Sequence, residues 1–201
     1  MTTSDTASAH PRDADGTRQR LLEAARIRFA RDGYSTTTVR DIAADAGVNV
    51  ALISRYFGSK EGLFEQCVTL VGKELDRPTL TAPTFDGIVR ALTHQVIEYS
   101  TGDGAAQLML LVRSSGDERA DAIRRGILQN FGSRLASAAG RSTDEERNLL
   151  NAQIVLATAI GIVQLRSGAG VEPLASATED ELTVPLRVVL SALLSKSSND
   201  D

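Results

Sequence analysis

Apolar residues recur along most of the chain with the spacing of helices rather than of strands. In the first such segment, about 17–31, one face carries Leu21, Leu22, Ala25 and Phe29. Gly33 follows this segment, where a helix-ending glycine is expected. No segment shows the alternation of apolar and polar residues that a half-buried strand requires. The pattern therefore predicts an all-α protein.

Two short helices joined by a tight turn are predicted next, over about 38–46 and 50–57. Thr38 with Asp41 resembles a capping box at the start of the first helix, and Gly47 permits a sharp turn after it. Asn49 is the expected N-cap of the second helix. Ile53 and Phe57 are placed to hold that helix against a core, which leaves small and polar side chains outside. This arrangement is typical of a helix-turn-helix.

The remaining pattern predicts six further helices, separated by glycine, proline and capping residues. Their expected ranges are about 60–75, 84–100, 105–114, 117–140, 142–167 and 178–195, with a linker at 77–83. Pro185 lies inside the last range, so we expect that helix to start late or to bend. We expect a disordered arm over 1–15, a three-helix domain that contains the helix-turn-helix over 16–62, and a second helical domain over 63–201.

The charge distribution separates the two ends of the chain. The whole chain carries a net charge of −4, but residues 17–62 carry eight basic and five acidic residues, a net charge of +3. A basic segment joined to an acidic remainder fits a nucleic-acid module fused to a different domain. A solvated helix face would give the same local excess.

Several other classes of protein find little support in the composition. Cys67 is the sole cysteine, so an intramolecular disulfide framework is excluded, and the helical spacing around it indicates a core residue. The apolar stretch 154–163 is shorter than a membrane-spanning helix, and the polar N-terminus lacks a signal peptide, so we expect a cytoplasmic protein. His10 and His94 are the only histidines, and no catalytic triad, metal cluster or phosphate-binding glycine loop is apparent. We therefore expect no enzyme, no metal and no cofactor.

The segment 21–64 resembles the TetR family of transcriptional regulators. The similarity rests on fixed spacings across five groups of residues: Phe29-x₃-Gly33-Tyr34, Thr37 to Ala43, Ala46 to Asn49, Tyr56-Phe57 and Ser59 to Phe64. Ser54 departs from the family, which usually has tyrosine at this position. The resemblance implies a DNA-binding regulator, most commonly a repressor, that acts as a homodimer and responds to a small-molecule effector. It implies that 16–62 is the DNA-binding domain and that 63–201 is the ligand-binding and dimerisation domain.

The resemblance also implies roles for individual residues at a DNA interface. Thr38, Tyr56 and Lys60 match positions that contact phosphate, and Thr38 and Lys60 also lie at helix starts, which favour an anion. Arg40 matches a position that reaches a base edge, and arginine there prefers guanine. The expected DNA-binding set is completed by Asn49, Val50, Leu52, Ser54 and Arg55. Taken singly, each of these residues has an ordinary structural explanation as well.

The second half of the chain predicts a dimer and offers candidates for an effector pocket. The segments 154–163 and 182–194 are apolar over a broad surface, which suits a four-helix interface between two subunits. A monomeric core would also bury them. Polar or adaptable residues on mostly apolar helices are the candidate pocket residues: His94, Gln107, Met109, Arg113, Asn130, Phe131 and Gln153. A dimer would place two recognition helices about 34–36 Å apart on an inverted-repeat operator.

Two other functions are compatible with parts of the sequence. One is an enzyme, which would differ from a regulator because it would not bind an inverted-repeat DNA with an affinity that falls steeply with salt. A helical module that binds a protein partner would use the same exposed residues of the third helix, but would not lose that binding on removal of Tyr56 and Lys60.

Overall fold

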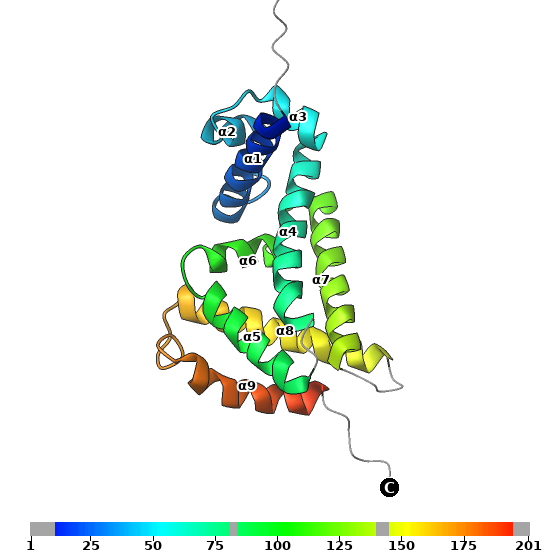
Figure 1. Cartoon of the computed structure of the whole chain (residues 1–201), viewed down its shortest axis with the longest axis vertical. Helices are drawn as coiled ribbons and strands as arrows, with labels where there is room; N and C mark the ends of the chain where they lie inside the picture. Colours follow the sequence, from blue (N-terminus) through cyan, green and yellow to red (C-terminus); the bar gives the residue numbers. More distant parts are fainter. Residues whose placement is uncertain (1–10, 81–83, 140–144, 195–201) are drawn as a thin grey trace, which may run out of the picture.

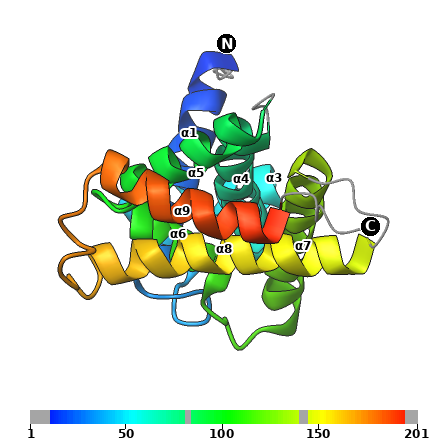
Figure 2. The same cartoon turned by 90° about the horizontal axis from the view of Figure 1, so that it is seen from below.

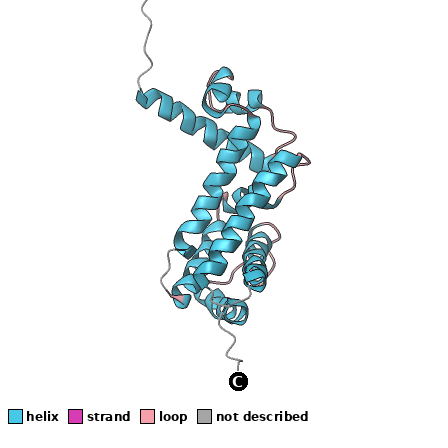
Figure 3. Cartoon of the chain, turned by 90° about the vertical axis from the view of Figure 1, so that its right-hand side faces the viewer, coloured by secondary structure: helices cyan, strands magenta, loops and turns pink. Residues whose placement is uncertain are grey.

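The computed structural model describes residues 11–80, 84–139 and 145–194, which form nine helices and no strand (Figures 1 and 3). The helices are α1 (Pro11–Arg31), α2 (Val39–Asp45), α3 (Ala51–Phe57), α4 (Lys60–Leu80), α5 (Phe85–Tyr99), α6 (Gly104–Val112), α7 (Glu118–Ala139), α8 (Glu145–Ser167) and α9 (Glu179–Leu194). The predicted all-α class is confirmed, and each predicted helix is present.

The helices are arranged as a small head on a larger body (Figure 1). Helices α1, α2 and α3 gather at one end, and α4 runs from this head into the body beside α7. At the opposite end α8 and α9 lie side by side, as the view from below shows (Figure 2). Because α4 belongs to both parts, the predicted boundary after residue 62 falls inside a continuous helix rather than in a linker.

Several helix ends follow from the capping residues in the sequence. Thr84 Oγ1 accepts a hydrogen bond from Gly87 N, and Asp117 Oδ1 accepts one from Ala120 N, at the starts of α5 and α7. Thr178 and Glu181 form the expected capping box of α9 through reciprocal bonds of 2.8 and 3.3 Å. The predicted caps Ser142 and Thr143 of α8 lie outside the described residues.

Three boundaries differ from the prediction. Helix α1 begins at Pro11, so the arm predicted over 1–15 overlaps it by several residues; proline suits the first position of a helix, where its missing N–H would have no partner. Helix α4 continues to Leu80, through part of the predicted linker at 77–83. Helix α9 starts at Glu179 in spite of Pro185, because its capping box fixes that start.

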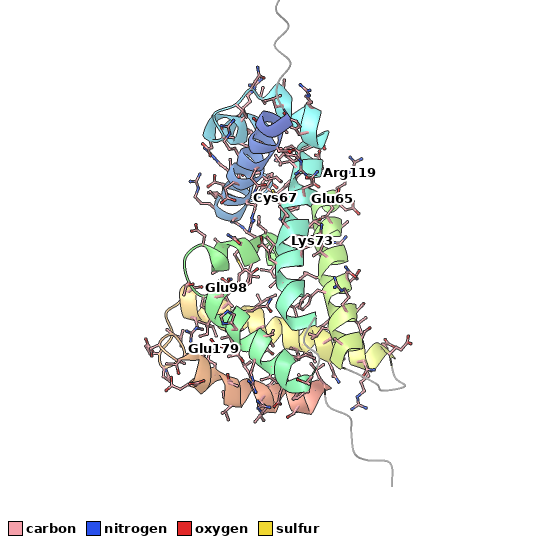
Figure 4. The ribbon with its side chains drawn as sticks, viewed as in Figure 1. Glu65, Cys67, Lys73, Glu98, Arg119 and Glu179 are labelled. Atoms are coloured by element: carbon pink, nitrogen blue, oxygen red, sulfur yellow. The ribbon has the colours of Figure 1, made fainter. Side chains whose placement is uncertain are left out.

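One hydrophobic core runs through the head and the body. Phe64 of α4 is fully buried and packs edge-on against Phe29, with ring centroids 5.2 Å apart, and against Tyr34 at 4.8 Å. Cys67 lies one turn further along α4, is also fully buried, and faces α1 (Figure 4). The head is therefore held on the body by shared aromatic packing.

Candidate functional site

The turn between α2 and α3 is built by a glycine in the left-handed region. Gly47 has φ +64°, and its N–H donates to Ala44 O, while Val48 N donates to Ala43 O at 3.0 Å. These two bonds make a Schellman motif, which satisfies carbonyl groups at the end of α2. Val48 then packs against the core, so the chain enters α3 at a fixed angle. The predicted turn is confirmed.

Helix α3 is anchored on one side and open on the other. Ile53 and Phe57 are buried, with exposed fractions of 2% and 7%. Asn49 Oδ1 accepts a hydrogen bond from Ala51 N at 2.8 Å, so Asn49 supports the start of the helix although Val50 occupies the cap position itself. The exposed residues of this region are Asn49, Val50, Ala51, Ser54 and Arg55. The spacing i, i+3, i+4 from Ala51 marks it as part of the outer face, which the sequence reasoning missed.

The predicted DNA-contacting residues differ in how freely they are presented. Leu52 and Tyr56 are half-buried and pack against the core. Thr38 Oγ1 donates to Asp41 Oδ2 at 2.7 Å, so its hydroxyl is already engaged within the capping box of α2. Lys60 Nζ lies 4.2 Å from the centre of the Tyr34 ring, and partial burial lowers its pKa.

Most of the basic residues of α1 serve the fold rather than an external anion. Arg28 forms a two-pronged pair with Asp45, which fixes α2 on α1 and lowers the pKa of that carboxyl group. Arg26 pairs with Glu74 of α4 at 3.1 Å. Arg40 and Arg55, by contrast, are exposed and have no ion pair among the described residues. Arg20 of α1 is exposed too and donates a hydrogen bond to Thr17 Oγ1, so the head presents at least three arginines without an ion pair to solvent.

A polar cluster joins the head to the start of α7. Ser35 of the head donates its hydroxyl to Ser115 O in the α6–α7 connection. Asp121 accepts from Ser115 N at 2.9 Å and from Arg124 Nη1 at 2.6 Å, and these bonds hold its pKa at about 2. Arg124 is only 5% exposed, and its guanidinium also lies 4.7 Å from the centre of the Phe64 ring. The α6–α7 connection is therefore bonded to both the head and the body.

An open cavity of about 480 Å³ lies between α6, α7 and α8, and several of its lining residues, Val112, Arg125 and Gln129 among them, are exposed to solvent. Its lining residues are Val112 from α6, Arg125, Leu128 and Gln129 from α7, and Gln153, Leu156, Ala157, Ile160 and Gly161 from α8. A second hollow of about 370 Å³ shares Val112, Arg125 and Leu128 with it. Cavities that bind small ligands have this size and a mostly apolar lining with a few polar groups.

Gln153 is the one predicted pocket residue that lines the larger cavity. The other six predicted residues lie elsewhere. Three of them are engaged by other residues: His94 is exposed with Nδ1 3.2 Å from Glu179 Oε2, Gln107 accepts a hydrogen bond from Arg26, and Arg113 donates one to Arg31 O. Phe131 is buried beside a much smaller hollow, Met109 is half-buried and Asn130 is exposed. The α8 lining recurs at i, i+3, i+4, i+7 and i+8. This spacing on α8 can be found in the sequence, but the packing of α7 beside it cannot.

Other candidate chemistry is weak in the described part of the chain. Burial raises the pKa of the Cys67 thiol to about 12, so the expected role as a core residue is confirmed. No group of three or more histidine, cysteine or acidic residues is placed to hold a metal ion within residues 11–80, 84–139 and 145–194.

One face of α8 and α9 exposes large apolar side chains. We call this surface the α8–α9 stripe: Leu150, Ile154 and Leu165 on α8, and Val184 and Val188 on α9. Val184 and Val188 are 67% and 62% exposed, which is unusual for neighbouring valines of one helix face. The opposite sides of both helices are buried, whereas no described residue covers the stripe.

Two family profiles match the chain and together account for the head and most of the body. Residues 21–67 match the bacterial regulatory proteins of the tetR family, and residues 86–194 match the tetracyclin repressor-like C-terminal domain. Among curated relatives, the HTH-type transcriptional repressor Rv3405c of Mycobacterium tuberculosis is 35% identical over 121 residues. That alignment covers 59% of this chain and 64% of the relative, just under two thirds of its length.

Solved structures share the fold over nearly the whole chain. Salmonella enterica GusR superposes with a TM-score of 0.72 at 20% identity, covering 96% of this chain and 100% of GusR. The SmeT–triclosan complex superposes with a TM-score of 0.66 at 22% identity, covering 90% of this chain and 93% of SmeT. The second profile alone spans more than half of the chain, in the region of the cavity and the α8–α9 stripe. The chain belongs to the TetR family of bacterial regulatory proteins.

Proposed function

We propose that the protein is a transcriptional repressor that binds an inverted-repeat operator as a homodimer and releases it on binding a small molecule. The observation that carries this proposal is the open face of α3, which presents Asn49, Val50, Ala51, Ser54 and Arg55 while Ile53 and Phe57 anchor it from behind. A recognition helix needs this combination of an exposed face and a rigid support to lie in a major groove.

The residues of the head divide into two expected kinds of contact. Arg40 and Arg55 are unpaired and are assigned to phosphate or base edges. Val50, 40% exposed, suits a thymine methyl group. Lys60 would either move away from the Tyr34 ring to contact a phosphate, or attract the phosphate by its charge while it stays on the ring. Thr38 contributes mainly by fixing the start of α2, since its hydroxyl is bonded to Asp41.

The dimer is supported by the α8–α9 stripe. Val184 and Val188 of one subunit, set against the same residues of a second, would bury side chains that the single chain leaves in water. Helix α8 is also the one described helix with the length and apolar composition to cross a membrane. We assign its exposed side to the dimer instead, because the adjoining α9 shares the stripe and the family is one of regulatory proteins. A cytoplasmic location follows from this assignment.

Effector control is supported by the cavity between α6, α7 and α8, and by the SmeT–triclosan complex as an example of a fold neighbour with a bound small molecule. The cavity touches the end of α6 and the first half of α7, the same segments whose connection is bonded to the head through Ser35 and Ser115. A ligand that fits one arrangement of these helices better than another shifts the population of head positions.

Footprinting of the purified protein on DNA from upstream of its own gene tests the DNA-binding proposal. We expect a protected inverted repeat whose affinity falls steeply with salt. Arg55→Glu should weaken operator binding by at least about tenfold, because it removes a contact and adds a repulsive charge. Arg90→Glu makes the same charge change at an exposed site of α5 and should leave affinity within about twofold. Equal losses from both variants would contradict a specific role for α3.

A further inference from the structure

Among the described residues, Arg125 is the one cation that lines the cavity between α6, α7 and α8. Arg125 is exposed, lines both the larger cavity and the adjoining hollow, and has no hydrogen-bond or ion-pair partner among the described residues. Its neighbour Arg124, by contrast, is bonded to Asp121 and to Leu110 O. The two successive arginines of α7 therefore have different tasks, one structural and one without a partner.

The surroundings of Arg125 favour an anion. The nearest carboxylate of the hollow, that of Asp121, is already occupied by Arg124 and by the hydroxyl groups of Ser114 and Ser115. Because Asp121 is paired with Arg124, no carboxylate among the described lining residues is left to pair with the exposed Arg125. A guanidinium presents two parallel N–H donors, which match the two oxygens of a carboxylate.

The rest of the cavity favours an apolar body. Beyond Arg125 the larger cavity is lined by Val112, Leu128, Leu156 and Ile160, with Gln129 and Gln153 as its other polar side chains. A neutral apolar molecule would gain nothing from Arg125, and a cationic one would be repelled by it. A volume of about 480 Å³ accommodates a medium-chain acyl group or a small aromatic system.

We propose that the effector is an amphipathic organic acid, with its carboxylate on Arg125 and its apolar part between α7 and α8. The assignment of this molecule as an effector rests on the proposed function, whereas its binding to the cavity does not. The carboxylate binds at the first half of α7, one residue after the arginine that packs on Phe64, so its charge acts on the segment that supports the head.

Calorimetric titration of the full chain, without DNA, tests the proposal. The probes are two matched pairs, decanoate with decanol and phenylbutyrate with phenylbutanol, each below its aggregation concentration. We expect each acid to bind at least about tenfold more tightly than its alcohol, as a charge-assisted hydrogen bond requires. Equal affinity of acid and alcohol, or no binding of either acid, would overturn the proposal.

Variants at two exposed arginines test whether the preference for the acid over its alcohol depends on Arg125. Arg125→Gln should weaken both acids about tenfold and leave the alcohols unchanged, and Arg125→Glu should reverse the preference, so that decylammonium binds better than decanoate. Arg90→Gln is the matched control for net charge and should change no affinity. Losses of equal size in Arg125→Gln and Arg90→Gln would overturn the assignment to Arg125.

The proposed function can fail separately from this inference. Acid binding that depends on Arg125, in a protein that protects no DNA, would keep the site and refute the repressor. A protected operator with no acid binding would keep the repressor and refute the acid site.

Discussion

Removal of the Asp121 carboxylate should destabilise the protein more than the loss of any helix cap. Asp121 accepts hydrogen bonds from Ser114 Oγ at 2.9 Å, Ser115 N at 2.9 Å, Ser115 Oγ at 2.8 Å and Arg124 Nη1 at 2.6 Å. In Asp121→Ala the guanidinium of Arg124, 5% exposed, keeps only Leu110 O and the Phe64 ring. Because the Asp121 side chain is 22% exposed, we expect the loss at the lower end of the range for buried pairs, about 3 kcal/mol.

Urea unfolding followed by circular dichroism, at one fixed protein concentration, measures this loss. A change of about 3 kcal/mol corresponds to a fall in Tm of roughly 6–12 °C for a chain of this size. Asp117→Ala removes the same charge from the same end of α7 together with one cap bond, and should cost about 1 kcal/mol.

The comparison of these variants decides whether the cost comes from the buried pair. If Asp121→Ala costs no more than Asp117→Ala, the cluster is an ordinary helix start and the reasoning is refuted. If it costs more, adding Arg124→Met should recover at least half of the loss, because the unpaired charge leaves with the arginine.

Three further predictions concern the proposed dimer, the turn after α2 and the stability at low pH. Val188→Asp should raise the dimer dissociation constant at least about thirtyfold in sedimentation experiments, since about 1 kcal/mol of burial is lost in each of two copies, whereas Val171→Asp should not. Gly47→Ala should cost about 1 kcal/mol in urea unfolding, because φ is +64° and an added Cβ meets no atom, while Gly16→Ala in α1 should be neutral or slightly stabilising. The folded-state pKa of Asp121 lies below its unfolded value, so the native chain should be more stable than Asp121→Asn above about pH 4 and lose that advantage as the pH falls toward 2, which unfolding at a series of pH values measures.

The local parts of this structure were predictable because they depend on neighbours in the sequence. The capping boxes at Thr38 and Thr178 and the turn at Gly47 each need residues within three or four positions, and the structure has all three. The family resemblance added the positions of the DNA-facing residues, whose contacts with DNA stay a prediction.

The features that could not be predicted depend on segments that lie far apart in the sequence. The basic excess of the head suggested a free positive surface. In the structure, however, Arg26 and Arg28 form ion pairs with Glu74 and Asp45, which only the fold brings near them. The cavity could not be predicted for the same reason, since Arg125 lines it only because α7 packs beside α8. Polar residues on apolar helices were a poor guide to it.

The burial of Phe64 between Phe29, Tyr34 and Arg124 limits how this chain can be recombined. An isolated fragment ending after α3 would expose half of an aromatic cluster, and we expect it not to fold alone. A chimaera that joins the proposed operator specificity of this head to the effector response of another regulator must therefore transplant α4 and the opening turns of α7 along with α3. The exchangeable module is set by the packing of one phenylalanine rather than by the end of the DNA-binding motif.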